Sequence, residues 1–197
     1  MRRYPLARER VLDAAEHLFV RYGYVKVTTE EIARDAGLSK KTLYELFAAK
    51  SAIVTALSIR SGRSILFALR DVLDASPTAF STAFSRFLAV AANANARFSG
   101  PLRSDLALAE PALYCRIDGL RRRFLRDALK RTLTRGQEMG SIRSTLDMDG
   151  TAIVLQSALD TMLHPDSTQS SPRPLPDSET ILSILLLGIS AQTTVHG

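Results

Sequence analysis

The chain has 197 residues, a formal charge of +6 and an isoelectric point of about 9.8. Hydrophobic residues make up 46% and charged residues 23%, which is the balance of an ordinary globular protein with room for a sizeable core. The basic balance favours a polyanionic partner, although many soluble proteins are mildly basic. The single cysteine, Cys115, excludes an intrachain disulfide and fits a reducing compartment. It lies among helix-end residues, and we expect it to be a small buried side chain.

Neither a leader nor a membrane span is expected. Residues 1–10 are charged, and they are not followed by the apolar run of a secretory signal. The longest apolar stretch, residues 181–191, is shorter than the roughly 20 residues that cross a bilayer. We therefore expect a cytoplasmic protein without a membrane partner.

Helical periodicity dominates the N-terminal quarter of the chain. Apolar residues recur on one arc of a helix over residues 8–22, and Gly23 tolerates the left-handed conformation that ends such a helix. Thr28 and Glu31 have the spacing of a capping box, which predicts a short second helix. Ser39 can cap a third helix.

The window from residue 29 to residue 46 fits a helix-turn-helix. Ala33 is small enough for the point where the two helices cross, and Gly37 tolerates the positive φ that the turn needs. The buried positions of the motif are all apolar in this chain, and they are Ile32, Ala36, Leu38, Leu43 and Leu46. Any one match is common, but the full set with caps at both helix starts is a strong indication of the motif.

The third helix would present a polar face to the major groove of DNA. Its outward residues are Lys40, Lys41, Thr42, Tyr44 and Glu45. Either lysine can donate to guanine, Thr42 can contact a base or a phosphate, and the Tyr44 hydroxyl is placed for a phosphate oxygen. Glu45 stays open between a cytosine contact, a pair with a lysine and a solvated position.

Lys50 lies at the start of the next helix, where its charge opposes the helix dipole. The fold alone gives a lysine no benefit there. A DNA phosphate at that helix end, by contrast, would be bound by the ammonium, the dipole and the free amides together. We therefore favour a phosphate contact over a plain surface lysine.

Residues 8–57 resemble the DNA-binding domain of the tetracycline-repressor (TetR) family. The resemblance is carried by VLDAAEHLFVRYGY in the first helix and by TTEEIARDAGLSKKTLYELFAAK after it. It implies that the third helix enters the major groove and that Thr42, Tyr44 and Lys50 contact the DNA backbone. Where the family often has a capping residue just before this lysine, the chain has Ala49, so the fourth helix is expected to start about one residue away from the family position. The expected DNA-binding residues are Thr28, Thr29, Ser39, Lys40, Lys41, Thr42, Tyr44 and Lys50.

After Lys50 the pattern changes to longer helices, which are expected over residues 51–73, 77–98, 105–115, 117–135, 149–163 and 178–194. The segment 164–177 is rich in Pro, Ser and Asp, which predicts a loop. We place the functional boundary near residue 50, with a helix-turn-helix domain over residues 1–50 and a second domain over residues 51–197. The resemblance implies that the second domain is all-helical and serves dimerisation and the binding of an unknown small-molecule effector.

The last two expected helices, near residues 151–163 and 180–194, are strongly apolar, and the second is apolar nearly all round. A homodimer that packs these helices as a four-helix bundle would cover the apolar surface. An intrachain core helix is the alternative.

Aromatic residues at helical spacing are core residues more often than ligand contacts. The candidates for a ligand pocket are Phe67, Phe84, Phe87, Tyr114 and Arg121. Arg121 falls within the apolar arc of its helix, which allows two interpretations. We favour snorkelling at a helix start over a cation that faces an acidic ligand.

The sequence has no pattern of an enzyme, a metal site or a cofactor site. His17, His164 and His196 are far apart, and no phosphate-cradling glycine loop or nucleophile motif is present. The sequence therefore predicts a ligand-responsive, sequence-specific regulator, a repressor that binds a near-palindromic double-stranded DNA operator as a homodimer. The alternatives are a small-molecule-binding or enzymatic helical protein with a vestigial helix-turn-helix, and a sequence-neutral DNA-packaging protein.

Overall fold

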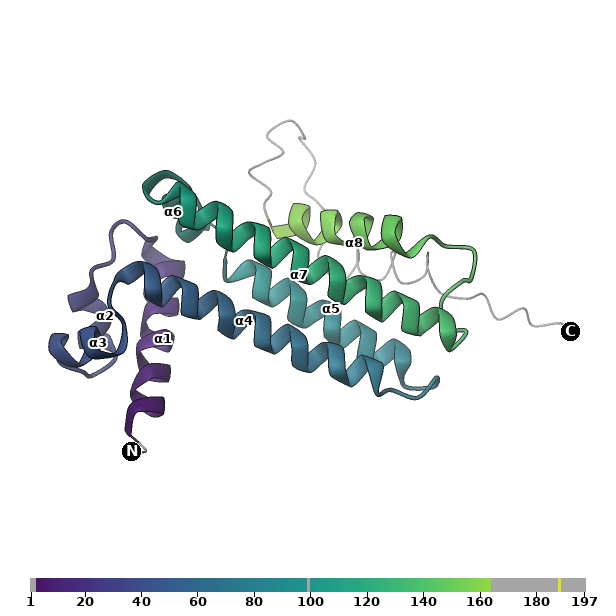
Figure 1. Ribbon diagram of the computed structural model, residues 1–197, viewed down its shortest axis with the longest axis horizontal. Helices are drawn as coiled ribbons and strands as arrows, with labels where there is room; N and C mark the ends of the chain where they lie inside the picture. Colours follow the sequence, from purple (N-terminus) through teal and green to yellow (C-terminus); the bar gives the residue numbers. More distant parts are fainter. Residues whose placement is uncertain (1–2, 99, 164–187, 189–197) are drawn as a thin grey trace, which may run out of the picture. The chain divides into compact units, whose positions relative to one another are not determined.

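The computed structural model describes residues 3–98, 100–163 and 188. The secondary-structure elements of this part of the chain are α-helices (Figure 1). They are α1 (Arg3–Tyr22), α2 (Thr29–Asp35), α3 (Lys40–Leu46), α4 (Lys50–Leu73), α5 (Phe80–Ala96), α6 (Gly100–Ala109), α7 (Pro111–Glu138) and α8 (Met148–Leu163). The expectation of an all-α chain that begins with a three-helix helix-turn-helix domain is confirmed.

The chain divides into two compact units. The first unit holds the residues up to Gly62 together with Ala96–Arg121, and the second holds Arg63–Asn95 together with the residues from Arg122 onward. Both α4 and α7 therefore contribute residues to each unit. The functional boundary near residue 50 stays a prediction.

The first unit is built around α1, whose apolar arc is fully buried. Val11, Ala15 and Phe19 are each 0% exposed. With seven residues each, α2 and α3 are too short to be stable alone, and they lie side by side next to α1 (Figure 1). Their apolar residues share one core with the start of α4 and with α6 and α7, and this core includes Ile32, Leu43, Ile53, Leu102, Leu106 and Ile117.

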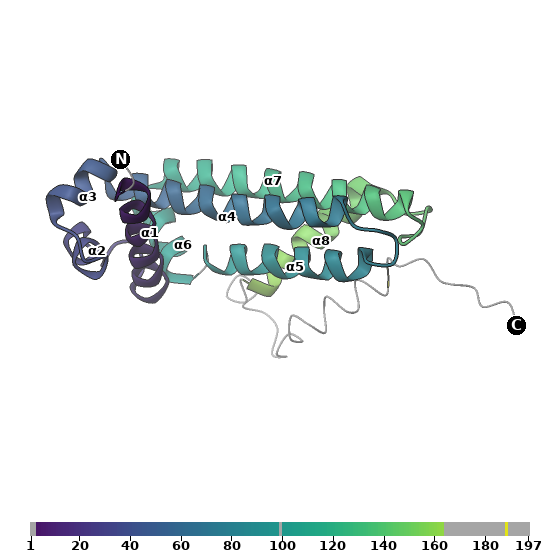
Figure 2. The same ribbon diagram turned by 90° about the horizontal axis from the view of Figure 1, so that it is seen from below.

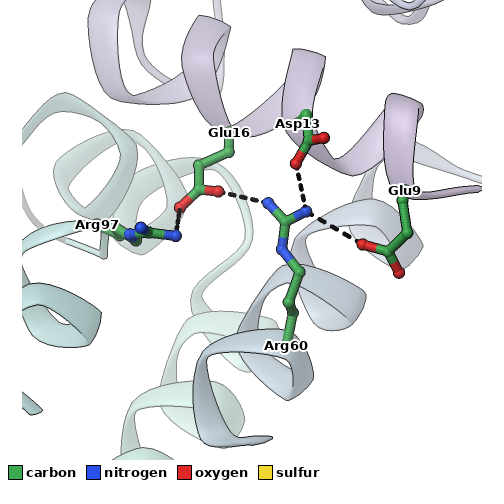
Figure 3. Close-up of polar contacts among 5 residues, drawn as sticks. All are labelled: Glu9, Asp13, Glu16, Arg60 and Arg97. Atoms are coloured by element: carbon green, nitrogen blue, oxygen red, sulfur yellow. Dashed lines mark hydrogen bonds and ion pairs between the residues drawn. The ribbon is translucent and has the colours of Figure 1, made fainter. Parts of the chain in front are cut away.

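A charged cluster joins α1 to α4 within the first unit (Figure 3). Arg60 of α4 lies among three carboxylates of α1: it is 2.6 Å from Asp13, 3.4 Å from Glu9, and also paired with Glu16. Glu16 binds a second cation, Arg97, at 3.0 Å. Burial alone would lower the pKa of Arg60, but the hydrogen bonds and charges of these carboxylates raise it. The cluster therefore ties the polar side of α1 to Arg60 of α4.

The second unit is organised by aromatic side chains on α5. The ring centroids of Phe80 and Phe84 are 5.7 Å apart, and those of Phe84 and Phe87 are 6.4 Å apart. All three side chains are buried, and they share a core with apolar residues of α4, α7 and α8. Stacked rings of this kind contribute both buried area and a defined geometry.

Polar bonds fix α8 along α7 in the second unit (Figures 1 and 2). Gln156 of α8 is only 3% exposed, and its amide donates to the Arg122 carbonyl at 3.0 Å and accepts from Arg126 at 3.0 Å. The Arg122 guanidinium also pairs with Asp160 at 3.0 Å. Because the buried amide is bonded on both sides, its burial does not leave an unsatisfied group.

Several expected helix boundaries are wrong, and α6 begins at Gly100 rather than at residue 105. The expected break between residues 115 and 117 instead lies between Ala109 and Pro111, where α6 ends and α7 begins. Proline suits the first position of a helix because its missing N–H would have no intrahelical acceptor there. α5 begins at Phe80 rather than at residue 77, because residues 76–79 form a turn closed by an N–H to carbonyl bond of 3.0 Å. The expected loop over 164–177 and nearly all of the expected helix over 178–194 lie outside the described residues.

By length and composition alone, α4 is able to cross a bilayer, with a mean hydropathy of 1.4 over its most apolar window. The sequence prediction did not identify this segment. Ile53 and Val54 are each 0% exposed in the first unit, while Ile65 and Val72 are 3% and 0% exposed in the second. A protein core therefore covers these apolar residues, and one such helix is weak evidence for a span.

Gly136→Ala should destabilise the protein, because a Cβ there would lie 2.5 Å from Phe80 Cζ and 2.6 Å from Ile142 Cδ1. Overpacking of this kind costs about 1–3 kcal/mol. Gly119 of the same helix is the matched control, because an added Cβ would meet no neighbouring atom within 4 Å. Gly119→Ala should stabilise by roughly 0.5–1 kcal/mol through its helix propensity. Urea unfolding measures both shifts, and a Gly136→Ala variant as stable as wild type would contradict the close packing.

Candidate nucleic-acid interface

The helix-turn-helix begins with the predicted capping box. The Thr28 N–H donates to Glu31 Oε2 at 2.8 Å, and the Glu31 N–H donates to Thr28 Oγ1 at 3.2 Å. The bonds from the Thr28 backbone and hydroxyl lower the pKa of Glu31, so its carboxylate is charged at neutral pH. Two amides at the start of α2 are satisfied, and the entry of the chain into this helix is fixed.

The turn between α2 and α3 has the predicted geometry. Gly37 has a φ of +63°, in the left-handed region that glycine adopts without strain. Ala33 is buried, and its carbonyl accepts the Leu38 N–H at 2.8 Å. Arg10 of α1 donates to the Gly37 carbonyl at 3.4 Å. Contacts from both α1 and α2 therefore set the direction in which α3 leaves the turn.

α3 exposes the face that was predicted to contact DNA. Ser39 caps the helix by accepting the Thr42 N–H at 3.1 Å, and the two hydroxyls lie 2.9 Å apart. Leu43 is 0% exposed and anchors the opposite face in the core. Thr42 is half-buried. The exposed residues of this face are Lys40, Lys41, Tyr44 and Glu45.

The two lysines of this face differ in their partners. The Lys40 ammonium pairs with Glu30 of α2, which raises the pKa of Lys40 and lowers the pKa of Glu30. Each side chain of this pair is 56% exposed, so the pair is a weak surface interaction. The Lys41 side chain is exposed, and the contacts recorded among the described residues do not include its ammonium. Lys41 is therefore the lysine that can approach DNA without breaking an ion pair.

Tyr44 is held by the start of α2. Its side chain is 44% exposed, and its hydroxyl lies 3.0 Å from Thr29 Oγ1. A hollow of about 400 Å³ beside the ring brings together four of the predicted DNA-binding residues, Thr28, Thr29, Tyr44 and Lys50. The rest of its lining is formed by Val25, Val27, Glu30, Ala48 and Ala49.

The expectation that the fold gives Lys50 no benefit is wrong. Its Nζ donates to the Tyr24 carbonyl at 2.7 Å and to the Val27 carbonyl at 2.9 Å, and it lies 4.2 Å from the centre of the Tyr24 ring. Burial lowers the pKa of this ammonium. An ammonium has three N–H donors, so these contacts among the described residues leave one for a further acceptor. We call residues 23–27, between α1 and α2, the connector. Lys50 binds two carbonyls of this segment.

Two acidic residues that the sequence reasoning missed also bind the connector. Asp105 of α6 accepts the Val25 N–H at 2.9 Å, and Glu110, just before α7, accepts the Tyr24 hydroxyl. Burial and the Glu110 carboxylate both raise the pKa of the Tyr24 hydroxyl, which stays protonated. The bonded residues are 80 and 86 positions apart in the chain, so no local sequence pattern identifies them.

The five candidate ligand-pocket residues are divided between the two units. Phe84 and Phe87 are 1% and 0% exposed in the core of the second unit, whereas Phe67 of α4 is 69% exposed. Tyr114 and Arg121 belong to the first unit. The membership of these residues in a ligand pocket stays a prediction.

Arg121 is not at a helix start, since α7 begins three turns earlier, at Pro111, and the interpretation as a snorkelling residue is wrong. Its side chain is 13% exposed, and it pairs with Asp118 at 2.9 Å. The guanidinium carbon is 6.0 Å from the centre of the Phe98 ring. A carboxylate one turn away therefore balances this charge within the protein.

Cys115 is exposed, and the expectation that it is buried is wrong. Leu113 and Ile117 of α7 are buried, and Cys115 is midway between them in sequence, which places it on the opposite side of the helix. Within residues 3–98 and 100–163, the structure has no group of three or more His, Cys, Asp or Glu that could hold a metal ion.

Comparison with known proteins identifies the helix-turn-helix. Residues 11–57 match the profile of a family described as bacterial regulatory proteins, tetR family. Over these residues the chain is similar to the TetR family of transcriptional regulators. The match supports, for the helix-turn-helix segment, the resemblance found in the sequence.

Curated relatives match the same part of the chain. An uncharacterized HTH-type transcriptional regulator of Mycobacterium tuberculosis (strain H37Rv), Rv1255c, is 40% identical over 77 residues, or 37% of this chain. The regulator YvkB of Bacillus subtilis (strain 168), also uncharacterized, is 45% identical over 49 residues, or 25% of this chain. The matched segments span only 38% and 26% of these two relatives' own lengths.

Solved structures share the fold over nearly the whole chain. SmeT in complex with triclosan has a TM-score of 0.68 at 23% identity, over 97% of this chain and 94% of SmeT. The ketosteroid transcriptional regulator KstR2 of Mycobacterium tuberculosis has a TM-score of 0.61 at 22% identity, over 94% of this chain and 95% of KstR2. At this level of identity the likeness establishes the fold.

Thr28→Ala should lower the free energy of unfolding by about 1 kcal/mol, because it removes the cap of α2. Thr28→Ser keeps the hydroxyl and should remain close to wild type. Chemical unfolding followed by far-ultraviolet circular dichroism measures both variants. Equal stability of Thr28→Ala and wild type would show that the capping box contributes nothing.

Proposed function

We propose that this protein is a ligand-responsive, cytoplasmic transcriptional repressor that binds a near-palindromic DNA operator as a homodimer. The observation that carries the proposal is the exposed face of α3, which presents Lys41 and Tyr44 while Leu43 is buried on the other side. A helix mounted in this way fits the major groove. The charge of +6 adds long-range attraction to the DNA.

The candidate residues divide into two roles. Lys40, Lys41 and Thr42, in the first turn of α3, contact base edges, and Lys40 does so by exchanging its partner Glu30 for DNA. At the hollow beside α3, the Tyr44 hydroxyl and the remaining Lys50 N–H bind phosphate oxygens. The exposed or half-buried Thr28, Thr29 and Ser39, at the starts of α2 and α3, flank these contacts.

A homodimer through the last two helices is supported by the surface of α8. Ile153 and Val154 of this helix are 47% and 60% exposed, which leaves an apolar stripe for a second protomer to cover. Two copies of α3 would then meet successive major grooves, roughly 34–36 Å or a multiple of this distance apart. The other expected helix of this interface lies outside the described residues.

Effector binding is supported by two of the structural neighbours, one solved with triclosan and one described as a ketosteroid regulator. In this protein a small molecule would bind near Phe67, Phe84 and Phe87, or near Tyr114 and Arg121. It releases DNA only if it binds the DNA-free arrangement of the dimer more tightly than the DNA-bound one.

Selection of bound duplexes from a random pool, with the full-length protein, tests the function. The proposal predicts enrichment of two inverted half-sites at a fixed spacing. Equal affinity for all duplexes would instead support DNA packaging. Absence of binding would support a helical protein with a vestigial helix-turn-helix.

Lys41→Ala should change the base preferred at one position of each half-site, because a base contact is lost. Tyr44→Phe is the matched control, since the loss of a phosphate contact should weaken binding by about fivefold on every sequence. Repeating the selection with both variants measures the preference. If Lys41→Ala selected the wild-type operator unchanged, the assignment of Lys41 to base recognition would be wrong.

Raising the salt concentration should weaken binding to the selected operator steeply, because each neutralised phosphate releases condensed counterions. A dimer with six or more phosphate contacts loses on the order of 10³-fold in affinity between about 50 and 200 mM salt. Fluorescence anisotropy measures the affinity, and circular dichroism over the same range checks that the helices persist. A flat response would contradict phosphate binding by this surface.

A further inference from the structure

The connector is tightly packed against the rest of the first unit. Gly23 has a φ of +87°, and a Cβ at this position would lie 2.3 Å from Asp105 Oδ2. Glycine is therefore needed both for the backbone conformation and for the approach of the carboxylate. Within the connector, Tyr24 and Val27 are 4% and 2% exposed, whereas Val25 and Lys26 between them are exposed.

Three elements anchor this five-residue segment. Lys50, at the start of α4, binds two of its carbonyls, while Asp105 of α6 and Glu110 before α7 bind an N–H and a hydroxyl. The charges of Glu110 and Asp105 also favour the charged form of Lys50. The two acids therefore bind the connector directly and also stabilise the charge of the lysine that binds it.

The connector leads directly into the surface proposed to bind DNA. The residue after it is Thr28, which caps α2, and the next residue, Thr29, holds the Tyr44 hydroxyl at 3.0 Å. Lys50 binds the connector and lines the same hollow as Tyr44. A continuous series of bonds therefore connects Asp105 and Glu110 to both proposed phosphate contacts.

We propose that Asp105 and Glu110 are positioning residues for DNA binding, which hold the connector so that Tyr44 and Lys50 reach the DNA backbone together. This inference rests on the proposed function. Near a phosphate backbone, electrostatics alone would make each of these carboxylates unfavourable for binding. Removing either carboxylate should nevertheless weaken DNA binding. A direct charge effect would strengthen it, so the direction of the change in affinity distinguishes a positioning role from a direct electrostatic one.

Asp105→Ala and Glu110→Ala should each lower the affinity of the full-length protein for the operator selected from the random pool by about tenfold. Asp105→Asn and Glu110→Gln keep an oxygen that accepts the same bond, so both should retain most of the wild-type affinity. Asp127→Ala is the matched control, because Asp127 is an exposed acid of α7 that belongs to the second unit. Its loss should leave the affinity unchanged or slightly increase it.

A double-mutant cycle separates positioning from general destabilisation. Tyr24→Phe and Glu110→Ala remove the two sides of one hydrogen bond, so their effects on operator affinity should not add. In the free protein, hydrogen exchange at the Val25 amide should be faster in Asp105→Ala than in Asp105→Asn or Asp127→Ala.

Wild-type affinity of both alanine variants, or equal losses in the alanine and amide variants, would overturn the positioning role while leaving the proposed function intact. If wild-type protein showed no operator preference, the proposed function would fail instead. In that case the exchange measurement still decides whether Asp105 holds the connector, because it needs no DNA. Unchanged exchange at Val25 in Asp105→Ala would then refute the anchor itself.

Discussion

The first unit depends on the fact that two seven-residue helices cannot be stable by themselves. α2 and α3 are ordered because Ile32 and Leu43 are buried in a core that α1, α4, α6 and α7 complete. The outer face of α3 is therefore exposed and does not contribute to this core. The same core also makes the helix-turn-helix and α6 parts of one compact unit. The surface proposed to contact DNA is therefore supported by residues of α6 and α7, which are far from it in sequence.

Local sequence patterns predict those features of the fold that are determined by residues close together in the chain. The capping box of Thr28, the left-handed Gly37 and the cap at Ser39 each involve residues within a few positions of one another, and the structure confirms all three. The helical period also predicted the burial of Ile32, Ala36 and Leu43, whereas Leu38 and Leu46 are only partly buried. The start of α7 at Pro111 has a local cause as well, because proline favours the first position of a helix.

The errors concern charged or polar side chains whose partners are distant in sequence. The value of Lys50 to the fold depends on two carbonyls more than 20 positions before it, and the bonds of Asp105 and Glu110 span 80 or more positions. Helical angle identified Arg121 as unusual but could not reveal how its charge is balanced. These contacts share one consequence, because several cations of the first unit also carry structural bonds. Lys50 and Arg60 both stabilise the unit, while the exposed Lys41 is the lysine proposed to contact DNA.

The contacts of the first unit make α2, α3 and α6 one cooperative structure. Native-state hydrogen exchange of the free protein in increasing denaturant tests it most directly, because it reports the opening free energy of each amide. We expect the protected amides of α2, α3 and α6 to converge on a common opening free energy. A separate opening of α2 and α3 at clearly lower free energy, with α6 still protected, would contradict it.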